Sequence, residues 1–350
     1  MRALTVMPGR AGSARLDETP DPAPDEGSVL VRTLAVGICG TDLEIVGGRY
    51  GWAPPGQDRL IIGHESVGRV EVAPSGCGLS ADDLVVGIVR RPDPVPCRYC
   101  AAGEWDMCAN GRYSERGIKE LNGYGSDRFR IEPAFALRID PSLGLLGVLL
   151  EPASVVAKAW DHVERIGSRS GAWAPRTALV TGAGPIGLLA ALIGRQRGLE
   201  VHVMDRVISG PKPQLVRELG GTYHAGHLPD DIDFTPDVII ECTGAPSVVL
   251  DALNRNTPSG IVCLAGISSG QHRIHLDVGT LNKSMVLEND AVFGSVNANR
   301  RHYEIAAEVL AKADRDWLSR LISRRIPLTH WAEAFDRRPD DVKVVLDFTL

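Results

Sequence analysis

Three residue types that bind zinc lie close together in the first part of the chain. Cys39 stands in the run ICGTD, and His64 and Glu65 follow 25 residues later in GHESVG. A catalytic zinc uses about three protein ligands and leaves one position open, and a thiolate, an imidazole and a carboxylate suit it. Glu151 could supply a further oxygen. Taken singly, Cys39 would more often be a small buried residue and His64 a core histidine, but together they predict a zinc site.

A second pattern with chemical meaning is the glycine-rich turn GAGPIG. It follows the apolar run 177–180 and precedes an apolar segment of helical type. Such glycines permit a tight turn, close approach of a pyrophosphate and close packing of a helix whose N-terminus faces the anion. The residues predicted to bind a dinucleotide here are Gly182, Gly184, Pro185, Ile186 and Gly187. The alternative is an ordinary turn between a strand and a helix.

The residues after the next predicted strand bear on the choice of cofactor. Asp205 ends that strand, where a carboxylate accepts hydrogen bonds from an adenosine ribose, and this favours NAD. Arg206 could stack on adenine or, together with Lys212, could offset a 2′-phosphate, so NADP stays open. The alternative is that both cations are solvated surface charges.

The elements that must position these residues change in type near residue 151. Before it, short strands at 29–36, 60–62, 68–72 and 84–89 are separated by Gly, Pro and Asp. After it, strands at 177–180, 201–204, 238–241 and 261–265 alternate with helices at 154–166, 186–198, 212–219 and 248–253. Helices at 303–312 and 330–335 and a strand at 343–348 end the chain. The pattern predicts an α/β protein: a β-rich domain and a doubly wound parallel sheet.

Composition excludes several classes of protein. The 350 residues are 44% hydrophobic and 23% charged, which favours two globular domains over a disordered chain. A net charge of −6 without a basic stripe argues against nucleic-acid binding. No uninterrupted apolar run approaches the roughly 18 to 20 residues that span a membrane, and the first ten residues lack a secretory signal pattern. The seven cysteines form no even framework of disulfides, so a cytoplasmic location is expected.

Taken together, these motifs resemble the zinc-dependent medium-chain dehydrogenases over essentially the whole chain. The resemblance rests on CGTD at residues 39–42, on GHE with Gly68, and on the turn at residues 182–187. Within that family the runs CGTDLEI, VRRP, YSERGI and GSVN are most similar to the glucose 1-dehydrogenase branch. The resemblance implies a chaperonin-10-like (GroES-like) catalytic domain at residues 1–154, completed by residues 301–350, and a Rossmann NAD(P)-binding domain at residues 155–300.

The resemblance also implies roles for individual residues. Zinc would be held by Cys39, His64 and Glu65, with Glu65 exchanging with water, while Glu151 binds zinc directly, binds it through water or touches the substrate. The implied sugar contacts are Thr41, Glu115, Glu151 and Asn297, and the residues implied to line the nicotinamide are Leu264, Gly266, Phe293 and Ser295. Val89 stands where some relatives have a polar residue, which removes one sugar contact.

The implied activity is that of an NAD(P)-dependent oxidoreductase acting on CH–OH donors. C1 of β-D-glucose would be oxidised to glucono-1,5-lactone, with Thr41 passing the alcohol proton outward and Glu44 continuing the relay. The alternative for Glu44 is a surface carboxylate. A polyol or secondary-alcohol dehydrogenase with the same zinc and cofactor is the nearer alternative function, and a non-catalytic redox sensor that binds NAD and metal is the remoter one. The expected partners are a small aldose and further copies of the chain, as a dimer or tetramer.

A lobe between residues 97 and 108 departs from the family pattern. Relatives hold a structural zinc with four cysteines spaced C-x2-C-x2-C-x7-C, and here Cys97, Cys100 and Cys108 match the last three. Pro94 replaces the first cysteine and has no ligand atom. A closed tetrahedral site needs about four protein ligands, and Asp93 lies one residue out of register between two prolines. We therefore expect an empty or weak site in the lobe and about one zinc per chain.

Overall fold

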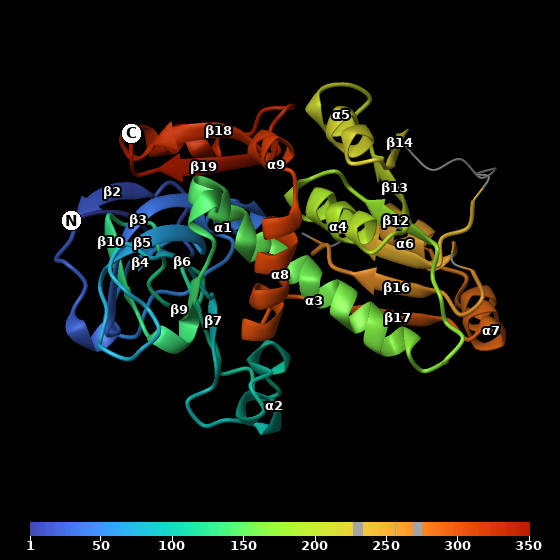
Figure 1. The fold of residues 1–350 in the computed structure, drawn as a ribbon, viewed down its shortest axis with the longest axis horizontal. Coiled ribbons are helices and arrows are strands. Elements are labelled where there is room, and N and C mark those ends of the chain that lie inside the picture. Colours follow the sequence, from blue (N-terminus) through green and yellow to red (C-terminus); the bar gives the residue numbers. More distant parts are fainter. Residues whose placement is uncertain (227–233, 256, 269–274) are drawn as a thin grey trace. The chain divides into compact units, whose positions relative to one another are not determined.

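The structure is a computed structural model that describes residues 1–226, 234–255, 257–268 and 275–350 (Figure 1). Contacts between Cα atoms divide the chain into two compact units. The β-rich unit comprises Met1–Ser154 and Asn297–Leu350, and the α/β unit comprises Val155–Val296.

The β-rich unit is built from short strands. These are β1 (Arg2–Val6), β2 (Arg15–Glu18), β3 (Val29–Ile38), β4 (Leu60–Ile61), β5 (Glu65–Val72), β6 (Leu84–Gly87), β7 (Arg90–Arg91), β8 (Ser114–Arg116), β9 (Glu120–Leu121), β10 (Arg128–Ile131), β11 (Ala136–Arg138), β18 (Ile322–Pro327) and β19 (Lys343–Asp347). Its helices are α1 (Gly40–Val46), α2 (Arg98–Ala101), α8 (Arg300–Lys312) and α9 (Arg315–Leu321), with 3-10 turns η1 (Pro24–Glu26), η2 (Trp105–Met107), η3 (Pro133–Phe135), η4 (Pro141–Leu149) and η5 (Leu328–Phe335).

The largest sheet of this unit joins the two ends of the chain. Its strand order is β11-β6-β5-β3-β19-β18, with β10 also paired to β3. Strand β3 is flanked by β5 on one side and by the C-terminal strand β19 on the other. One buried cluster accordingly draws on distant parts of the sequence: Leu4, Ile62, Ile118, Val344 and Leu346.

The α/β unit is a single parallel sheet with helices. Its strands are β12 (Thr177–Thr181), β13 (Glu200–Asp205), β14 (Thr222–Ala225), β15 (Val238–Glu241), β16 (Ile261–Leu264) and β17 (Ala291–Gly294). Its helices are α3 (Leu150–Gly167), which begins just before the unit, α4 (Pro185–Gln196), α5 (Pro211–Glu218), α6 (Pro246–Leu253) and α7 (Val278–Glu288). The strand order β14-β13-β12-β15-β16-β17 is that of a Rossmann sheet, and the predicted fold class is confirmed.

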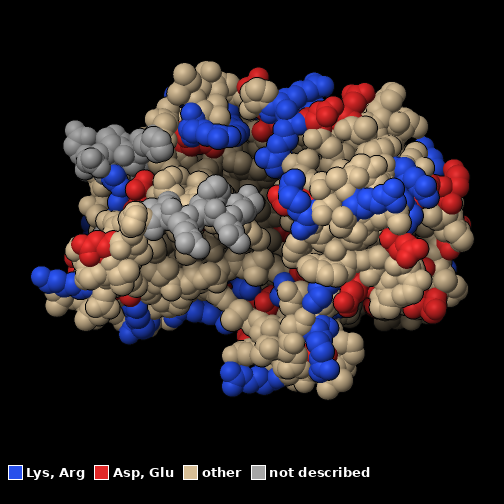
Figure 2. Space-filling view, turned by 180° about the vertical axis from the view of Figure 1, so that it is seen from behind, with Lys and Arg blue, Asp and Glu red and all other residues tan. Residues whose placement is uncertain are grey.

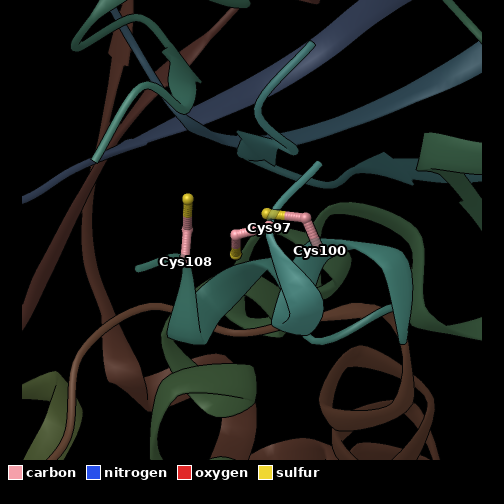
Figure 3. Close-up of side chains that lie close together, drawn as sticks. All are labelled: Cys97, Cys100 and Cys108. Atoms are coloured by element: carbon pink, nitrogen blue, oxygen red, sulfur yellow. The ribbon is translucent and has the colours of Figure 1, made fainter. Parts of the chain in front are cut away.

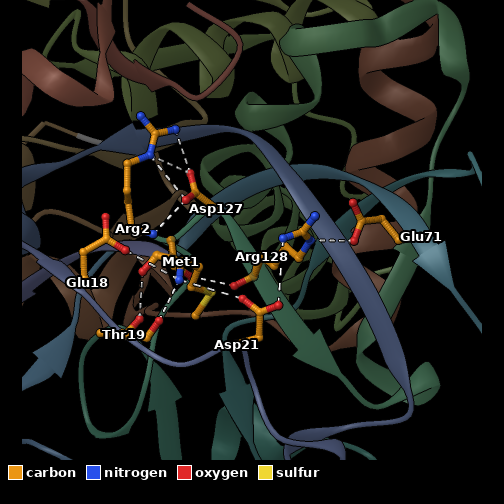
Figure 4. Close-up of polar contacts among 9 residues, drawn as sticks. Met1, Arg2, Glu18, Thr19, Asp21, Glu71, Asp127 and Arg128 are labelled. Carbon is orange, nitrogen blue, oxygen red and sulfur yellow. Dashed lines mark hydrogen bonds and ion pairs between the residues drawn. The ribbon is translucent and has the colours of Figure 1, made fainter.

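Ion pairs connect the start of strand β10 with strands β1 and β5 in the β-rich unit (Figure 4). Arg2 on β1 pairs with Asp127 at 2.8 Å, and the Asp127 carboxylate also accepts the Arg2 backbone N–H. One residue further on, Arg128 pairs with Glu71 on β5 at 2.8 Å. The start of β10 is therefore bound to both β1 and β5.

Charged side chains of both signs are interspersed over the face of the molecule shown in Figure 2, without a large area of one sign. One helical segment, Pro141–Gly167, is long and apolar enough to cross a membrane by length and composition alone. Of its most apolar window 72% is buried inside the protein, which is typical of a core helix.

Candidate active site

Cys39, His64 and Glu65 converge because the ends of two neighbouring strands carry them. Strand β3 ends one residue before Cys39, β5 begins at Glu65, and Gly37 on β3 lies opposite Glu65. Gly37 leaves the space that the Glu65 carboxylate occupies, since a Cβ there would lie 2.0 Å from Glu65 Oε2. Cys39 Sγ lies 3.1 Å from His64 Nε2, and the ligand atoms of all three residues lie within 4.8 Å of one another.

This cluster fits a zinc ion. Atoms bound to one tetrahedral zinc at about 2.0–2.3 Å lie about 3.5 Å apart, close to the observed separation of Cys39 Sγ and His64 Nε2. Sulfur, nitrogen and oxygen are the donors that zinc takes, and three of them leave a position for substrate. The cluster is mostly withdrawn from water, with His64 and Glu65 buried and Cys39 half-buried.

A residue that sequence reasoning missed, Asp42, orients the histidine. Asp42 Oδ1 lies 3.4 Å from His64 Nδ1, and neither atom has a hydrogen-bond partner elsewhere in the described part of the chain. Asp42 Oδ2 accepts the Cys39 backbone N–H at 2.9 Å. Burial alone would lower the pKa of His64, but the Cys39 thiolate and the Asp42 carboxylate raise it well above its usual value. A carboxylate behind a metal-binding histidine is the usual arrangement at zinc sites.

Lys343 is the second residue that sequence reasoning missed. Its ammonium donates to both oxygens of Glu65, at 2.7 and 2.6 Å, and all three atoms are buried. Burial would lower the pKa of Lys343, but Glu65 raises it above its usual value, so the lysine is a cation beside the zinc cluster. The sequence contained one signal for this role: Lys343 is the single lysine at the start of the apolar C-terminal strand β19.

Glu151, in the first turn of α3, is buried near the same charges. Burial raises its pKa to about 7; the Glu65 carboxylate adds to this shift, whereas His64 and Lys343 oppose it. Burial therefore favours the protonated form of Glu151 more than in a solvent-exposed carboxyl group. Its direct contact with zinc or with substrate stays a prediction.

The two residues of the predicted proton relay lie in different surroundings. The Thr41 backbone N–H donates to Cys39 Sγ at 3.2 Å, so Thr41 adjoins the zinc cluster. Glu44 instead forms two hydrogen bonds with Arg49, at 2.9 and 3.2 Å, and its side chain is 37% exposed. The bond from Arg49 lowers the pKa of Glu44. The structure brings Thr41 to the cluster and shows Glu44 in a surface ion pair.

Two predicted sugar contacts lie together. Glu115 Oε1 accepts hydrogen bonds from Asn297 Nδ2 at 2.7 Å and from Arg90 Nε and Nη2 at 3.0 and 2.9 Å. Both Arg90 and Glu115 are buried, on the paired strands β7 and β8, and the Arg90 guanidinium lies 3.7 Å from the centre of the Tyr113 ring. These contacts form a hydrogen-bonded polar network in the same unit as the zinc cluster.

The glycine-rich turn has the shape that a dinucleotide needs. Gly182 adopts φ 88°, and a Cβ at Gly187 would lie 1.7 Å from the Gly182 carbonyl oxygen, so both positions require glycine. Gly184 caps the N-terminus of α4, and Pro185 and Ile186 are its first two residues. A bulkier residue at Gly187 would push the helix away from the turn.

Asp205 is tied to this turn. Its carboxylate accepts the backbone N–H of Ala183 at 2.6 Å and that of Val207 at 3.0 Å, and Lys212 Nζ lies 3.8 Å away. Arg206 is exposed beside it. The carboxylate therefore lies against the glycine-rich turn with two cations nearby, and its contact with a ribose stays a prediction.

The residues implied to line the nicotinamide gather at the carboxyl ends of β16 and β17. The Ser295 backbone N–H donates to Leu264 O at 2.9 Å, and Phe293 lies opposite Cys263 in the sheet. Gly266 has no room for a side chain, because a Cβ there would lie 2.2 Å from Gly244 N. These contacts bring four residues together at the carboxyl ends of two neighbouring strands: Leu264, Gly266, Phe293 and Ser295.

The cysteine lobe contains three cysteine side chains that lie close together (Figure 3). The Sγ atoms of Cys97, Cys100 and Cys108 lie within 4.8 Å of one another, and no fourth Cys, His, Asp or Glu of the described residues joins them. The carboxylate of Asp93 accepts hydrogen bonds from Val95 N, Asn110 Nδ2 and Arg112 Nε at 2.8, 2.9 and 3.2 Å. Asp93 is therefore committed to other partners, and the lobe does not offer a closed zinc site.

Comparison with known proteins agrees with this geometry. Residues 25–139 match the model of the alcohol dehydrogenase GroES-like domain, and residues 144–348 match that of the glucose dehydrogenase C-terminus. The chain belongs to the zinc-dependent medium-chain dehydrogenases. Within them it falls in the glucose 1-dehydrogenase branch.

Relatives along the full chain support the branch. The chain is 42% identical to glucose 1-dehydrogenase of Thermoproteus tenax and 39% identical to glucose 1-dehydrogenase 1 of Caldivirga maquilingensis, each over 99% of both chains. A solved structure of Haloferax mediterranei glucose dehydrogenase, in complex with NADP, Zn and gluconolactone, superimposes with a TM-score of 0.92 at 33% identity over 100% of both chains. The predicted family is thus confirmed.

Proposed function

We propose that this chain is a zinc-dependent glucose 1-dehydrogenase that oxidises C1 of β-D-glucose to glucono-1,5-lactone and transfers the hydride to NAD(P)+. The observation that carries the proposal is the convergence of Cys39, His64 and Glu65 in the unit that also holds the Glu115–Asn297 pair. Full-length relatives named glucose 1-dehydrogenase support it, as does the related Haloferax structure with NADP, zinc and gluconolactone.

In this proposal Cys39, His64 and Glu65 hold zinc, with Glu151 beside them. When bound, zinc supplies a Lewis acid that stabilises negative charge on the C1 oxygen, and NAD(P)+ supplies the hydride acceptor. Thr41 accepts the C1 hydroxyl proton and passes it outward, with Glu44 as the next member of the relay. Asp42 fixes the ring of His64, and Lys343 fixes the carboxylate of Glu65.

Selection of a sugar follows from the buried polar network. Glu115 and Asn297 are held by each other and by Arg90, so they keep their orientation before substrate arrives. An apolar alcohol bound beside them would exclude water from these polar groups without offering them a hydrogen bond, which disfavours it. We propose that Glu115, Asn297, Thr41 and Glu151 contact the sugar hydroxyls.

In this proposal one unit carries the catalytic residues and the other binds the cofactor. Residues 1–154 with residues 301–350 form the GroES-like catalytic domain, and residues 155–300 form the NAD(P)-binding domain. The glycine-rich turn, Asp205 and Arg206 bind the pyrophosphate and adenosine end, and the group at the ends of β16 and β17 binds the nicotinamide. We further propose that the chain works in the cytoplasm, where its seven free cysteines suit a reducing medium, and that it assembles as a dimer or tetramer.

A substrate panel tests the proposed function. NAD(P)H formation is measured for glucose, galactose, xylose, sorbitol and simple secondary alcohols, each with NAD+ and with NADP+. We expect the highest kcat/KM for an aldose and accumulation of aldonic acid from the hydrolysed lactone. Higher efficiency with sorbitol or a simple alcohol would establish the polyol or secondary-alcohol alternative, and cofactor binding without turnover of any substrate would establish the redox-sensor alternative.

A further inference from the structure

The three thiols of the lobe differ in position and exposure. Cys97 is half-buried at the N-cap of α2, Cys100 is buried one turn later, and Cys108 is half-buried after η2. The C-x2-C spacing places Cys97 and Cys100 on the same side of a single turn of helix, with sulfur atoms within 4.8 Å. A disulfide requires an S–S distance of about 2.05 Å, which side-chain rotation across one turn can supply.

The two thiols also differ in acidity. Backbone N–H groups of Cys100 and Ala109 donate toward Cys97 Sγ and lower the pKa of Cys97 to about 6. Burial raises the pKa of Cys100 to about 11, so this thiol keeps its proton at neutral pH. An accessible thiolate beside a buried thiol is the arrangement in which the first sulfur reacts and the second resolves the product.

We propose that Cys97 and Cys100 form a dithiol that hydroperoxides oxidise to a disulfide. The Cys97 thiolate attacks the distal oxygen of the hydroperoxide, the O–O bond breaks, and Cys97 becomes a sulfenic acid while the peroxide leaves as an alcohol or as water. Cys100 sulfur then displaces the sulfenic hydroxyl, which leaves with the thiol proton as water. The two thiols lose two electrons and two protons, and the peroxide is reduced by two electrons.

The lobe is connected to the predicted sugar contacts within the β-rich unit. Arg90 Nη1 donates to the backbone oxygen of Asp106 in η2 at 3.1 Å, and Asn299 Nδ2 donates to Asp106 Oδ1 at 2.8 Å. Arg90 in turn holds Glu115. A disulfide that changes the packing of the lobe therefore shifts Glu115 through Asp106 and Arg90. We expect this shift to raise KM for glucose severalfold with a smaller change in kcat. This consequence rests on the proposed function, whereas the disulfide itself does not.

Peptide mass mapping tests the proposal on the zinc-loaded enzyme. The protein is treated with a graded excess of hydrogen peroxide, remaining thiols are alkylated, and the chain is digested with trypsin without reductant. Cleavage after Arg98 places Cys97 in the peptide 91–98 and the other two cysteines in the peptide 99–112. We expect these two peptides joined by a disulfide that dithiothreitol releases.

Variants identify the partner of Cys97. In Cys100→Ser the cross-link should disappear and a dimedone adduct of Cys97 should accumulate, whereas Cys108→Ser should keep the cross-link. Cys77→Ser removes a half-buried thiol outside the lobe and serves as the matched control, with no change expected. Reduction with dithiothreitol should return KM to its starting value.

Three results would overturn the proposal. One is a disulfide confined to the peptide 99–112, which would leave Cys97 unreacted. Another is a zinc content of two per chain with all three lobe thiols protected from peroxide. The third is persistence of the cross-link in Cys100→Ser. The mass readout needs no substrate, so it stands even if the enzyme acts on a sugar other than glucose.

Discussion

At the scale of single residues, the zinc cluster is held by neighbours that do not themselves bind the metal. Asp42 orients His64 from one side, and Lys343 neutralises Glu65 from the other. These neighbours bring one carboxylate and one ammonium group to the ligand residues before metal arrives. The affinity for zinc should therefore depend on them as well as on the ligands.

Asp42→Asn tests that dependence. The amide keeps the shape of the side chain but loses the charge that holds the His64 imidazole in place. We expect the zinc affinity, measured by competition with a chromophoric chelator, to fall about 10- to 100-fold with little change in the circular dichroism spectrum. Asp251→Asn, an exposed aspartate on α6, is the control and should bind zinc as the wild type does. Unchanged affinity in Asp42→Asn would show that the pair is not part of the metal site.

The cofactor preference is also decided by single side chains. We expect Asp205 to disfavour a 2′-phosphate and Arg206 to favour one, and we expect wild-type enzyme to use NAD at least as well as NADP. Arg206→Ala should lower kcat/KM for NADP about tenfold, because a charged hydrogen bond to phosphate is lost, and should leave the value for NAD nearly unchanged. Steady-state kinetics with both cofactors measure this. Equal losses for both cofactors would assign Arg206 to adenine stacking instead.

At the scale of elements, the sequence predicted those helices and strands that a local pattern of apolar residues marks. Strands β12, β13, β15 and β16 of the Rossmann sheet and the helix after the glycine turn are buried runs, and the structure has them within a few residues of the predicted bounds; the exposed edge strand β14 was not predicted. Helix α7 was not predicted, because none of its residues is buried and no apolar stripe marks it. The predicted helix at 330–335 is part of the 3-10 segment η5, which has apolar residues at helical spacing but a kink at His330.

The residues of the site also fall into two groups, those with a local sequence signal and those placed by distant strand pairing. Cys39, His64 and Glu65 carry donor types that spacing can reveal, whereas Lys343 reaches Glu65 only through the pairing of β19 with β3. That pairing joins residues about three hundred positions apart in the sequence, and no local pattern encodes it. Asp42 had a local signal, since it closes a capping box with Cys39 at the start of α1.

The last strand, β19, also pairs with β18, and a buried carboxylate tests how much that contact stabilises the fold. The buried carboxylate of Asp347, at the end of β19, accepts hydrogen bonds from Thr349 and from Arg325 Nε at 2.7 Å. Burial alone would raise the pKa of Asp347, but these bonds lower it below its usual value. We expect Asp347→Asn to lower the free energy of unfolding by about 2 kcal/mol at pH 7.

The effect has a defined pH dependence. A lowered carboxyl pKa stabilises the fold fully above about pH 4, and that stabilisation is lost as the pH falls through the folded-state pKa. Urea unfolding of the wild type and Asp347→Asn should therefore differ most near neutrality and converge in acid. Asp340→Asn, an exposed aspartate in the preceding loop, should match the wild type throughout. A difference that stayed constant into acid would exclude the charge as its cause.

At the scale of the whole molecule, the edge of the Rossmann sheet predicts assembly. Strand β17 ends the described sheet, so one row of its backbone groups has no neighbouring strand there. The adjacent helix α7 exposes Val286 and Leu287 by 66% and 69%. Pairing of such edges between copies would cover both features.

Light scattering of the purified protein measures this. One chain has a mass of 37.6 kDa. Because the edge of its described Rossmann sheet is uncovered, we expect the measured mass to be that of two or four chains. Val286→Lys should shift the population toward smaller species, whereas Val72→Lys, at an exposed site in the β-rich unit, should not. A mass near 37.6 kDa for the wild type would contradict assembly.

The central claim is that zinc held by Cys39 and His64 is required for oxidation of glucose. Its most direct test is a metal titration: zinc is removed with a chelator, then returned stepwise while glucose-dependent NAD(P)H formation is followed. We predict that activity returns in proportion to zinc and saturates at about one ion per chain, and that His64→Ala stays folded but regains neither metal nor activity. Undiminished hydride transfer from glucose by metal-free His64→Ala would contradict the claim.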